Sequence, residues 1–168
     1  MALSAQFLGS QINAKAGHQQ NDQFKTISYT GDGVDMPLAK GLASKRNYLA
    51  EHPNDARQWF RLGNLLSYLN RPKETFAALR KALHIEPNAV DAKLALAMTL
   101  NDSQQETEAW AVMQKALEHL SSWKFLIPNP DFSEEFADFY NHLRKTLGKH
   151  KLPALLPSAL TSSKKNGS

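Results

Sequence analysis

The sequence predicts an all-α protein made of stacked antiparallel helical hairpins, closed at the C-terminal end by a capping helix. Two observations carry this prediction. The tripeptide Lys81–Leu83 recurs unchanged at Lys115–Leu117, and further residues match at the same separation in the sequence. In each copy, apolar residues recur at the spacing of an α-helix. A repeat unit that consists of two helices indicates a solenoid, in which each unit packs on its neighbours.

The offset between the two copies is 34 residues, as Pro53 and Pro87 illustrate. Identical pairs are Leu62 and Leu96, Leu66 and Leu100, Glu74 and Glu108, and Ala77 and Ala111. Similar pairs are Gly63 and Ala97, Phe76 and Trp110, and Leu79 and Met113. Matches along the whole unit predict that the two copies share one fold.

The first copy predicts two helices with a tight turn between them. Pro72 lies between the helices, and proline is tolerated in the first turn of a helix but not in its interior. Small residues at Gly63 and Ala82, one on each helix, would let the two helices approach closely. The apolar residues at helical spacing are Trp59, Leu62, Leu66 and Leu69 on the first helix, and Phe76, Leu79 and Leu83 on the second.

These residues resemble the tetratricopeptide repeat (TPR) family, whose repeat is a helix–turn–helix unit of this length. The first copy carries the family's pattern at Trp59, Leu62-Gly63, Leu66, Leu79, Ala82 and Pro87. The second copy is looser, because Lys93 replaces Trp59 and Ser121 replaces Pro87. The resemblance covers residues 56–121 closely and 37–148 loosely. It implies a right-handed superhelix with a concave groove lined by the first helix of each repeat.

The flanks are expected to complete the stack. Residues 37–53 read as the second helix of a degenerate or halved repeat, and Asp131–Gly148 reads as the capping helix, with Ser133 at its start. The predicted organisation is therefore a flexible N-terminal arm (1–36), a TPR-like domain (37–149) with clear repeats at about 56–89 and 90–121, and a flexible basic C-terminal tail (150–168).

Composition limits the function further. The chain has no cysteine, a net charge of +4 and a pI of about 9.3. It lacks a run of apolar residues that could span a membrane and does not begin like a secretory signal, which fits a cytoplasmic protein. No acidic residue follows Asp138. This basic end either complements a helix dipole and forms a solvated tail, or provides a patch for an acidic partner.

No pattern typical of an enzyme is present. Gly31–Gly33 reads as a turn rather than a phosphate-binding loop, because no helix with Lys and Ser/Thr follows it directly. The histidines are scattered, and no pair has the spacing of a helical zinc site. The sequence therefore predicts neither catalytic activity, nor a metal, nor a cofactor.

The groove implied by the resemblance is the candidate site for a partner. Arg57 and Arg61 lie one turn apart and could bind a carboxylate, while Asn64 could bond a peptide backbone. Phe60, Leu94 and Met98 would form an apolar floor, although Phe60 and Leu94 could instead only pack against a neighbouring helix. The full candidate set is Arg57, Phe60, Arg61, Asn64, Tyr68, Asp91, Leu94, Met98 and Asn101.

A second candidate surface is the segment Ser122–Phe132, an apolar run bounded by prolines. It predicts either a buried plug between the second repeat and the capping helix or an exposed partner site.

The sequence as a whole predicts a protein–protein interaction module, either an adaptor, an assembly factor or a subunit of a complex, that binds an extended or helical segment of another protein. The alternative is binding of nucleic acid or ribonucleoprotein through the basic C-terminal region, although the modest net charge argues against it. Steep salt dependence would distinguish this alternative.

Overall fold

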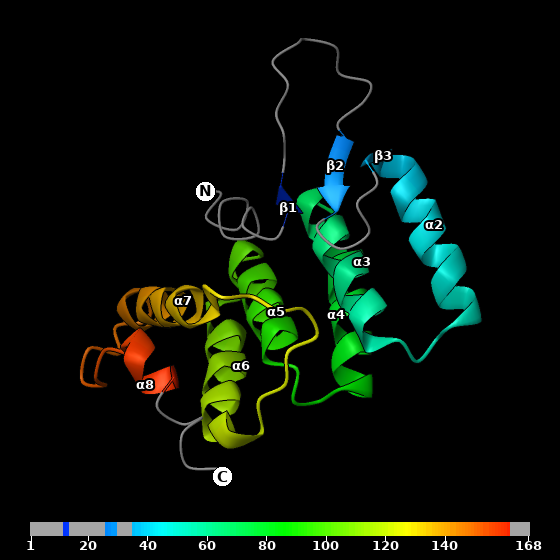
Figure 1. Ribbon diagram of the computed structural model, residues 1–168. Helices are drawn as coiled ribbons and strands as arrows, with labels where there is room; N and C mark the ends of the chain where they lie inside the picture. The colour runs from blue at the N-terminus through cyan, green and yellow to red at the C-terminus, as the bar shows by residue number, and fades with distance from the viewer. Residues whose placement is uncertain (1–11, 14–25, 30–34, 162–168) are drawn as a thin grey trace.

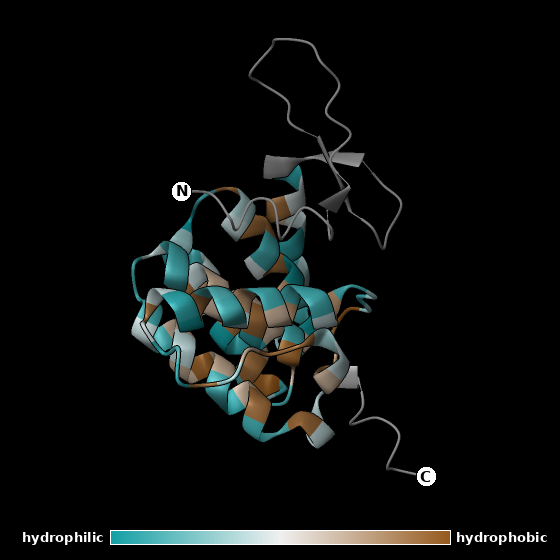
Figure 2. Cartoon of the chain, turned by 90° about the vertical axis from the view of Figure 1, so that its left-hand side faces the viewer, coloured by the Kyte–Doolittle hydropathy of each residue, from teal (hydrophilic) through white to brown (hydrophobic). Residues whose placement is uncertain are grey.

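The computed structural model describes residues 12–13, 26–29 and 35–161, and its main body is a stack of helices (Figure 1). The helices are α2 (Leu38–Glu51), α3 (Ala56–Tyr68), α4 (Pro72–Ile85), α5 (Val90–Asp102), α6 (Glu106–Glu118), the 3-10 helix η2 (Leu120–Ser122), α7 (Phe132–Thr146) and α8 (Pro157–Thr161). The all-α prediction is confirmed for this body. Hydrophobic residues concentrate between the helices, while hydrophilic residues cover the outer surface (Figure 2).

Three short strands precede the helices. They are β1 (Ile12–Asn13), β2 (Thr26–Tyr29) and β3 (Asp35–Pro37), which form an antiparallel sheet in the order β1-β2-β3. Sequence analysis assigned these residues, except Pro37, to the flexible N-terminal arm, because this region is polar and shows no sustained period. The rest of the predicted arm lies outside the described residues, so its flexibility stays a prediction.

Each of the two repeats forms a helical hairpin, α3 with α4 and α5 with α6, and the turns inside the hairpins match in detail. Asn70 and Gln104, which are equivalent at the offset of 34, both have positive φ, at 54° and 61°. The amide of Arg71 donates to the carbonyl of Leu66 at 3.0 Å, and the equivalent amide of Gln105 donates to Leu100 at 2.9 Å. The repeated sequence thus produces one repeated turn, in which a left-handed residue lets the chain close over the end of the first helix.

The two helices of each hairpin approach closely at small residues. Ala82 and Ala116 are fully buried. A Cβ atom built on Gly63 would lie only 2.7 Å from Cδ2 of Leu79, so α3 and α4 touch directly at this glycine. In the second copy the equivalent residues are Ala97 and Met113, both fully buried, and methionine is a more flexible side chain than leucine.

Helix α2 packs as the second helix of a halved repeat. Leu42 and Leu49 are buried and contribute to the same cluster as Leu62, Leu65 and Leu66 of α3. Tyr48 is equivalent to the buried Ala82 but is 40% exposed, because no first helix covers it within the described residues.

Helix α7 is the predicted capping helix, and it crosses α5 and α6 at a steep angle (Figure 1). It begins at Phe132 after an N-cap at Asp131, rather than at the expected Ser133, and Asp131 forms no side-chain capping bond. Gly148, with φ of 63°, ends this region as expected. No helix in the described part of the chain is long and apolar enough to cross a membrane.

Helix α8 lies within the segment that sequence analysis assigned to the flexible tail. It packs on α7, and its Leu160 is 5% exposed and belongs to the main hydrophobic cluster. This contact depends on a distant apolar surface, which the local Pro-rich and Ser-rich composition does not reveal. The residues from 162 onward lie outside the described part.

We expect Gly63→Ala to lower the free energy of unfolding by about 1–2 kcal/mol, because overpacking outweighs the gain of about 1 kcal/mol in helix propensity. Adding Leu79→Met should recover most of this loss, since the second repeat already pairs alanine with methionine. Urea unfolding of both single variants and the double variant would measure the coupling. Purely additive effects would contradict the proposed contact.

Candidate functional site

The predicted groove residues on α3 differ widely in exposure. Arg57 is exposed, Arg61 is half-buried, and Tyr68 at the end of the helix is 38% exposed. Phe60 and Asn64 are buried. The part of α3 that remains accessible is therefore its arginine pair and its C-terminal tyrosine.

The apolar floor predicted for the groove is buried in this structure. Phe60, Leu94 and Met98 are 2%, 5% and 5% exposed and belong to one hydrophobic cluster. The alternative that Phe60 and Leu94 pack against neighbouring elements is thus what the structure shows. Asn101, further along α5, is half-buried.

Asp91 is the predicted groove residue whose role differs most from the expectation. Its carboxylate is 3% exposed and accepts hydrogen bonds from the amides of Ala92 (2.9 Å), Leu126 (2.8 Å) and Ile127 (3.0 Å). Burial raises the pKa of Asp91, and these backbone hydrogen bonds partly oppose that rise. Both carboxylate oxygens are engaged within the chain, so Asp91 holds the connection between α6 and α7 instead of facing a partner.

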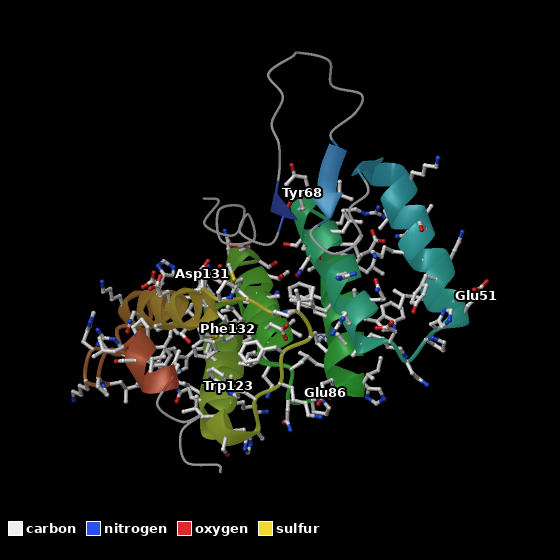
Figure 3. All side chains as sticks on the ribbon, viewed as in Figure 1. Glu51, Tyr68, Glu86, Trp123, Asp131 and Phe132 are labelled. Carbon is white, nitrogen blue, oxygen red and sulfur yellow. The ribbon has the colours of Figure 1, made fainter. Side chains whose placement is uncertain are left out.

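The apolar residues of the segment Ser122–Phe132 pack against the main hydrophobic cluster instead of forming an exposed patch. Leu126 and Phe132 are buried, and Trp123, Phe125 and Ile127 are half-buried. Its start pairs with the α4–α5 connection, since the amide of Val90 donates to the carbonyl of Lys124 and the amide of Lys124 donates to the carbonyl of Asn88, both at 2.9 Å. The indole of Trp123 donates to the carbonyl of Ala116 at 2.7 Å. Trp123 and Phe132 lie close together (Figure 3), with ring centroids 5.7 Å apart in an edge-to-face arrangement.

Asn64 stands apart among the buried polar side chains. Asn64, Thr75, Asp91 and Thr99 are the polar or charged residues found buried in the described part of the chain. The hydroxyls of Thr75 and Thr99 donate to backbone carbonyls one turn earlier, and Asp91 accepts three amides. The carboxamide oxygen Oδ1 of Asn64 is buried without a hydrogen-bond partner. An orphaned buried acceptor costs about 1–3 kcal/mol.

Sequence analysis missed a hollow on the other side of α3. A cavity of about 340 Å³ lies between α2, α3 and α4, and its lining includes Arg46 and Glu74, which form an ion pair with each other. Its lining is mostly apolar: Arg46, Leu49, Ala50, Trp59, Leu62, Leu66, Glu74, Ala77 and Ala78. Small residues on α2 and α4 leave this space, and sequence alone could have indicated it only once the two helices were known to face each other.

No group of three or more His, Cys, Asp or Glu side chains in the described ranges could hold a metal ion. Helix α3 carries one buried unpaired acceptor, Oδ1 of Asn64, and two arginines one turn apart, Arg57 and Arg61.

Comparison with known proteins identifies the fold but not a family. No family profile matches the sequence, and no curated protein matches it. Two solved structures of MamA, a protein that contains TPRs, resemble the chain. The first is 16% identical with a TM-score of 0.56 over 77% of this chain and 70% of that one. The second is 14% identical with a TM-score of 0.54 over 68% and 57%. At these identities the likeness concerns the fold alone, which is TPR-like.

We expect Asp91→Ala to lower the free energy of unfolding by about 1–3 kcal/mol, because it leaves buried amides without an acceptor. Since the pKa of Asp91 in the folded protein is raised above its ordinary 3.8, the folded state binds this proton more tightly than the unfolded chain. Stability contributed by Asp91 therefore falls as the pH rises from 3.8 through the raised pKa.

The loss caused by Asp91→Ala should consequently be larger at acidic pH than at neutral pH. Urea unfolding at several pH values measures it, with Asp102→Ala, an exposed acid at the end of the same helix, as the control. A loss that grows toward neutral pH would mean that the pKa of Asp91 is lowered instead.

Proposed function

We propose that this protein is an interaction scaffold that binds a segment of a partner protein along the inner side of α3. The observation that carries the proposal is the orphaned oxygen of Asn64. A buried acceptor without a donor lowers stability, and a donor from a bound partner would remove that cost. A backbone amide of an extended segment is the simplest such donor.

The neighbouring residues suit the same ligand. Arg57 and Arg61 precede Asn64 on α3 at helical spacing and would favour an acidic partner. Tyr68 offers an exposed aromatic ring at the far end of the helix, and interface contacts are enriched in tyrosine and arginine. The partner class is therefore an extended, partly acidic protein segment, and adaptor or assembly roles fit this class.

Burial of Phe60, Leu94 and Met98 restricts the proposed contact. A partner would first meet Arg57, Arg61 and Tyr68 at the surface and would reach Asn64 only after the local packing adjusts. Such adjustment is common among regulatory interactions.

We expect Asn64→Leu to raise the free energy of unfolding by about 1 kcal/mol while weakening partner binding, because it replaces an unsatisfied acceptor with an apolar side chain of similar size. The control is Thr75→Val, which removes a satisfied hydroxyl and should lower stability without altering binding. Thermal unfolding and titration against the partner recovered by pull-down and mass spectrometry give both readouts. A stabilised variant with unchanged binding would remove Asn64 from the site.

We expect Arg57→Glu with Arg61→Glu to weaken partner capture strongly, because reversed charge repels an acidic ligand. Arg57 is exposed, so its reversal should shift stability by less than about 0.5 kcal/mol, whereas Arg61 is half-buried, and melting of the double variant is therefore measured beside capture. If this double variant keeps its partner while Lys149→Glu with Lys151→Glu releases it, the basic end and not α3 is the partner site.

A further inference from the structure

The loop that joins α7 to α8 is exposed over almost its whole length. Residues 148–154 and Leu156 are exposed, and only Leu155 among them is half-buried. The exposed set includes two large apolar side chains, Leu152 at 40% and Leu156 at 63%. The loop lies at the left edge of the molecule in Figure 1, beside α7 and α8. Two exposed leucines on one loop suggest a surface that binds another apolar surface.

Hydrogen bonds from α7 fix the conformation of this loop. The guanidinium Nη1 of Arg144 donates to the carbonyls of Leu152 at 2.9 Å and His150 at 3.4 Å. The carboxamide of Asn141 donates to the carbonyl of Leu155 at 2.7 Å and accepts from its amide at 2.9 Å. The loop is thus tied to α7 on both sides of Leu152. Its leucines are therefore exposed in a conformation that hydrogen bonds hold in place.

Positive charge gathers on this loop and on the last turn of α7 before it. Lys145 of α7 and Lys149 and Lys151 of the loop are exposed, and none of them pairs with a carboxylate within the described residues. The ammonium of Lys149 lies over the ring of Trp110, 5.9 Å from its centroid, and still remains exposed. The sequence contains no acidic residue after Asp138. A helix dipole accounts for Lys145 in the last turn of α7, but its effect fades within that turn and does not reach Lys151.

We propose that this loop docks on an anionic phospholipid bilayer, with Leu152 and Leu156 entering the interface and the three lysines meeting the headgroups. Exposed apolar side chains flanked by lysines are the features that bind interfaces reversibly, and basic residues near an anionic leaflet add attraction. The exposure of these leucines favours a bilayer over an acidic protein, because protein partners concentrate their binding energy in packed pockets. A bilayer needs no shaped pocket, so single protruding side chains can insert into it.

The first test is flotation of the full chain with phosphatidylcholine vesicles, with or without phosphatidylserine. The protein should float with the phosphatidylserine vesicles and not with phosphatidylcholine alone, and added salt should reduce flotation. Leu152→Ser with Leu156→Ser, and separately Lys149→Glu with Lys151→Glu, should each weaken binding by about tenfold. Lys40→Glu with Lys81→Glu, which changes the net charge equally on exposed lysines of α2 and α4, should bind like the parent.

The second test locates the contact. The chain contains no cysteine, so Leu152→Cys gives a single attachment point for an environment-sensitive dye. Its emission should shift to the blue on phosphatidylserine vesicles, whereas the same dye at Tyr48→Cys should not respond. Circular dichroism before and after heating confirms that each variant is folded.

Three results would overturn the proposal. One is a parent protein that does not float with phosphatidylserine vesicles, and capture by a polyglutamate peptide in that case would identify an acidic protein partner instead. Another is equal weakening by the Lys40/Lys81 control pair, which would indicate nonspecific charge attraction. The third is unaltered binding of the Leu152/Leu156 variant, because the lysines alone would then account for binding.

Discussion

The whole stack depends on the close approach of the two helices in each hairpin, which is possible only where a small residue lies at the crossing. Gly63 meets Leu79 in the first hairpin, and the fully buried Ala82 and Ala116 lie on the second helices. Protein interiors are packed as densely as organic crystals, so this spacing cannot relax cheaply. The spacing between α3 and α4 sets the position of the side of α4 that packs on α5. The second hairpin has Ala97 and Met113 at the equivalent positions. The hairpin contact therefore determines the separation of α3 and α5, and with it the placement of Asn64 and Asp91.

Sequence predicted the parts of the fold that follow from local chemistry repeated at a fixed distance. The two copies predicted two helical hairpins, and Asn70 and its equivalent Gln104 adopt the same left-handed turn inside them. The folding of 122–132 over the N-terminal end of α5 was harder to foresee, because it rests on Asp91 meeting the amides of Leu126 and Ile127, about one repeat away in the chain. An acidic residue in an otherwise apolar helix was the available signal, and it pointed equally well to a groove and to a buried contact.

The two buried polar residues of the candidate site show how stability and recognition diverge. Asp91 and Asn64 both face the interior from a first helix of a hairpin, but Asp91 meets backbone amides while the oxygen of Asn64 meets none. The desolvation of a buried acceptor is offset only if a donor reaches it. Asp91 therefore contributes to holding the chain on itself, whereas Asn64 weakens the folded state unless something else binds. Natural proteins break local rules of this kind chiefly at functional sites.

The two ends of the stack solve the problem of an unpaired helix in different ways, and this difference bears on the exposed loop. At the N-terminal end, polar or exposed residues such as Lys45 and Tyr48 replace the apolar ones that an adjoining helix would cover. At the C-terminal end, α7 keeps an apolar surface, and Leu155 and Leu160 pack against it. Leu155 and Leu160 thus take the inward positions of this segment, and Leu152 and Leu156 are its exposed leucines. Leu152 and Leu156 therefore remain exposed beside Lys149 and Lys151, and neither lysine pairs with a carboxylate within the described residues. Because helix packing does not bury these two leucines, their side chains are accessible to an external apolar surface.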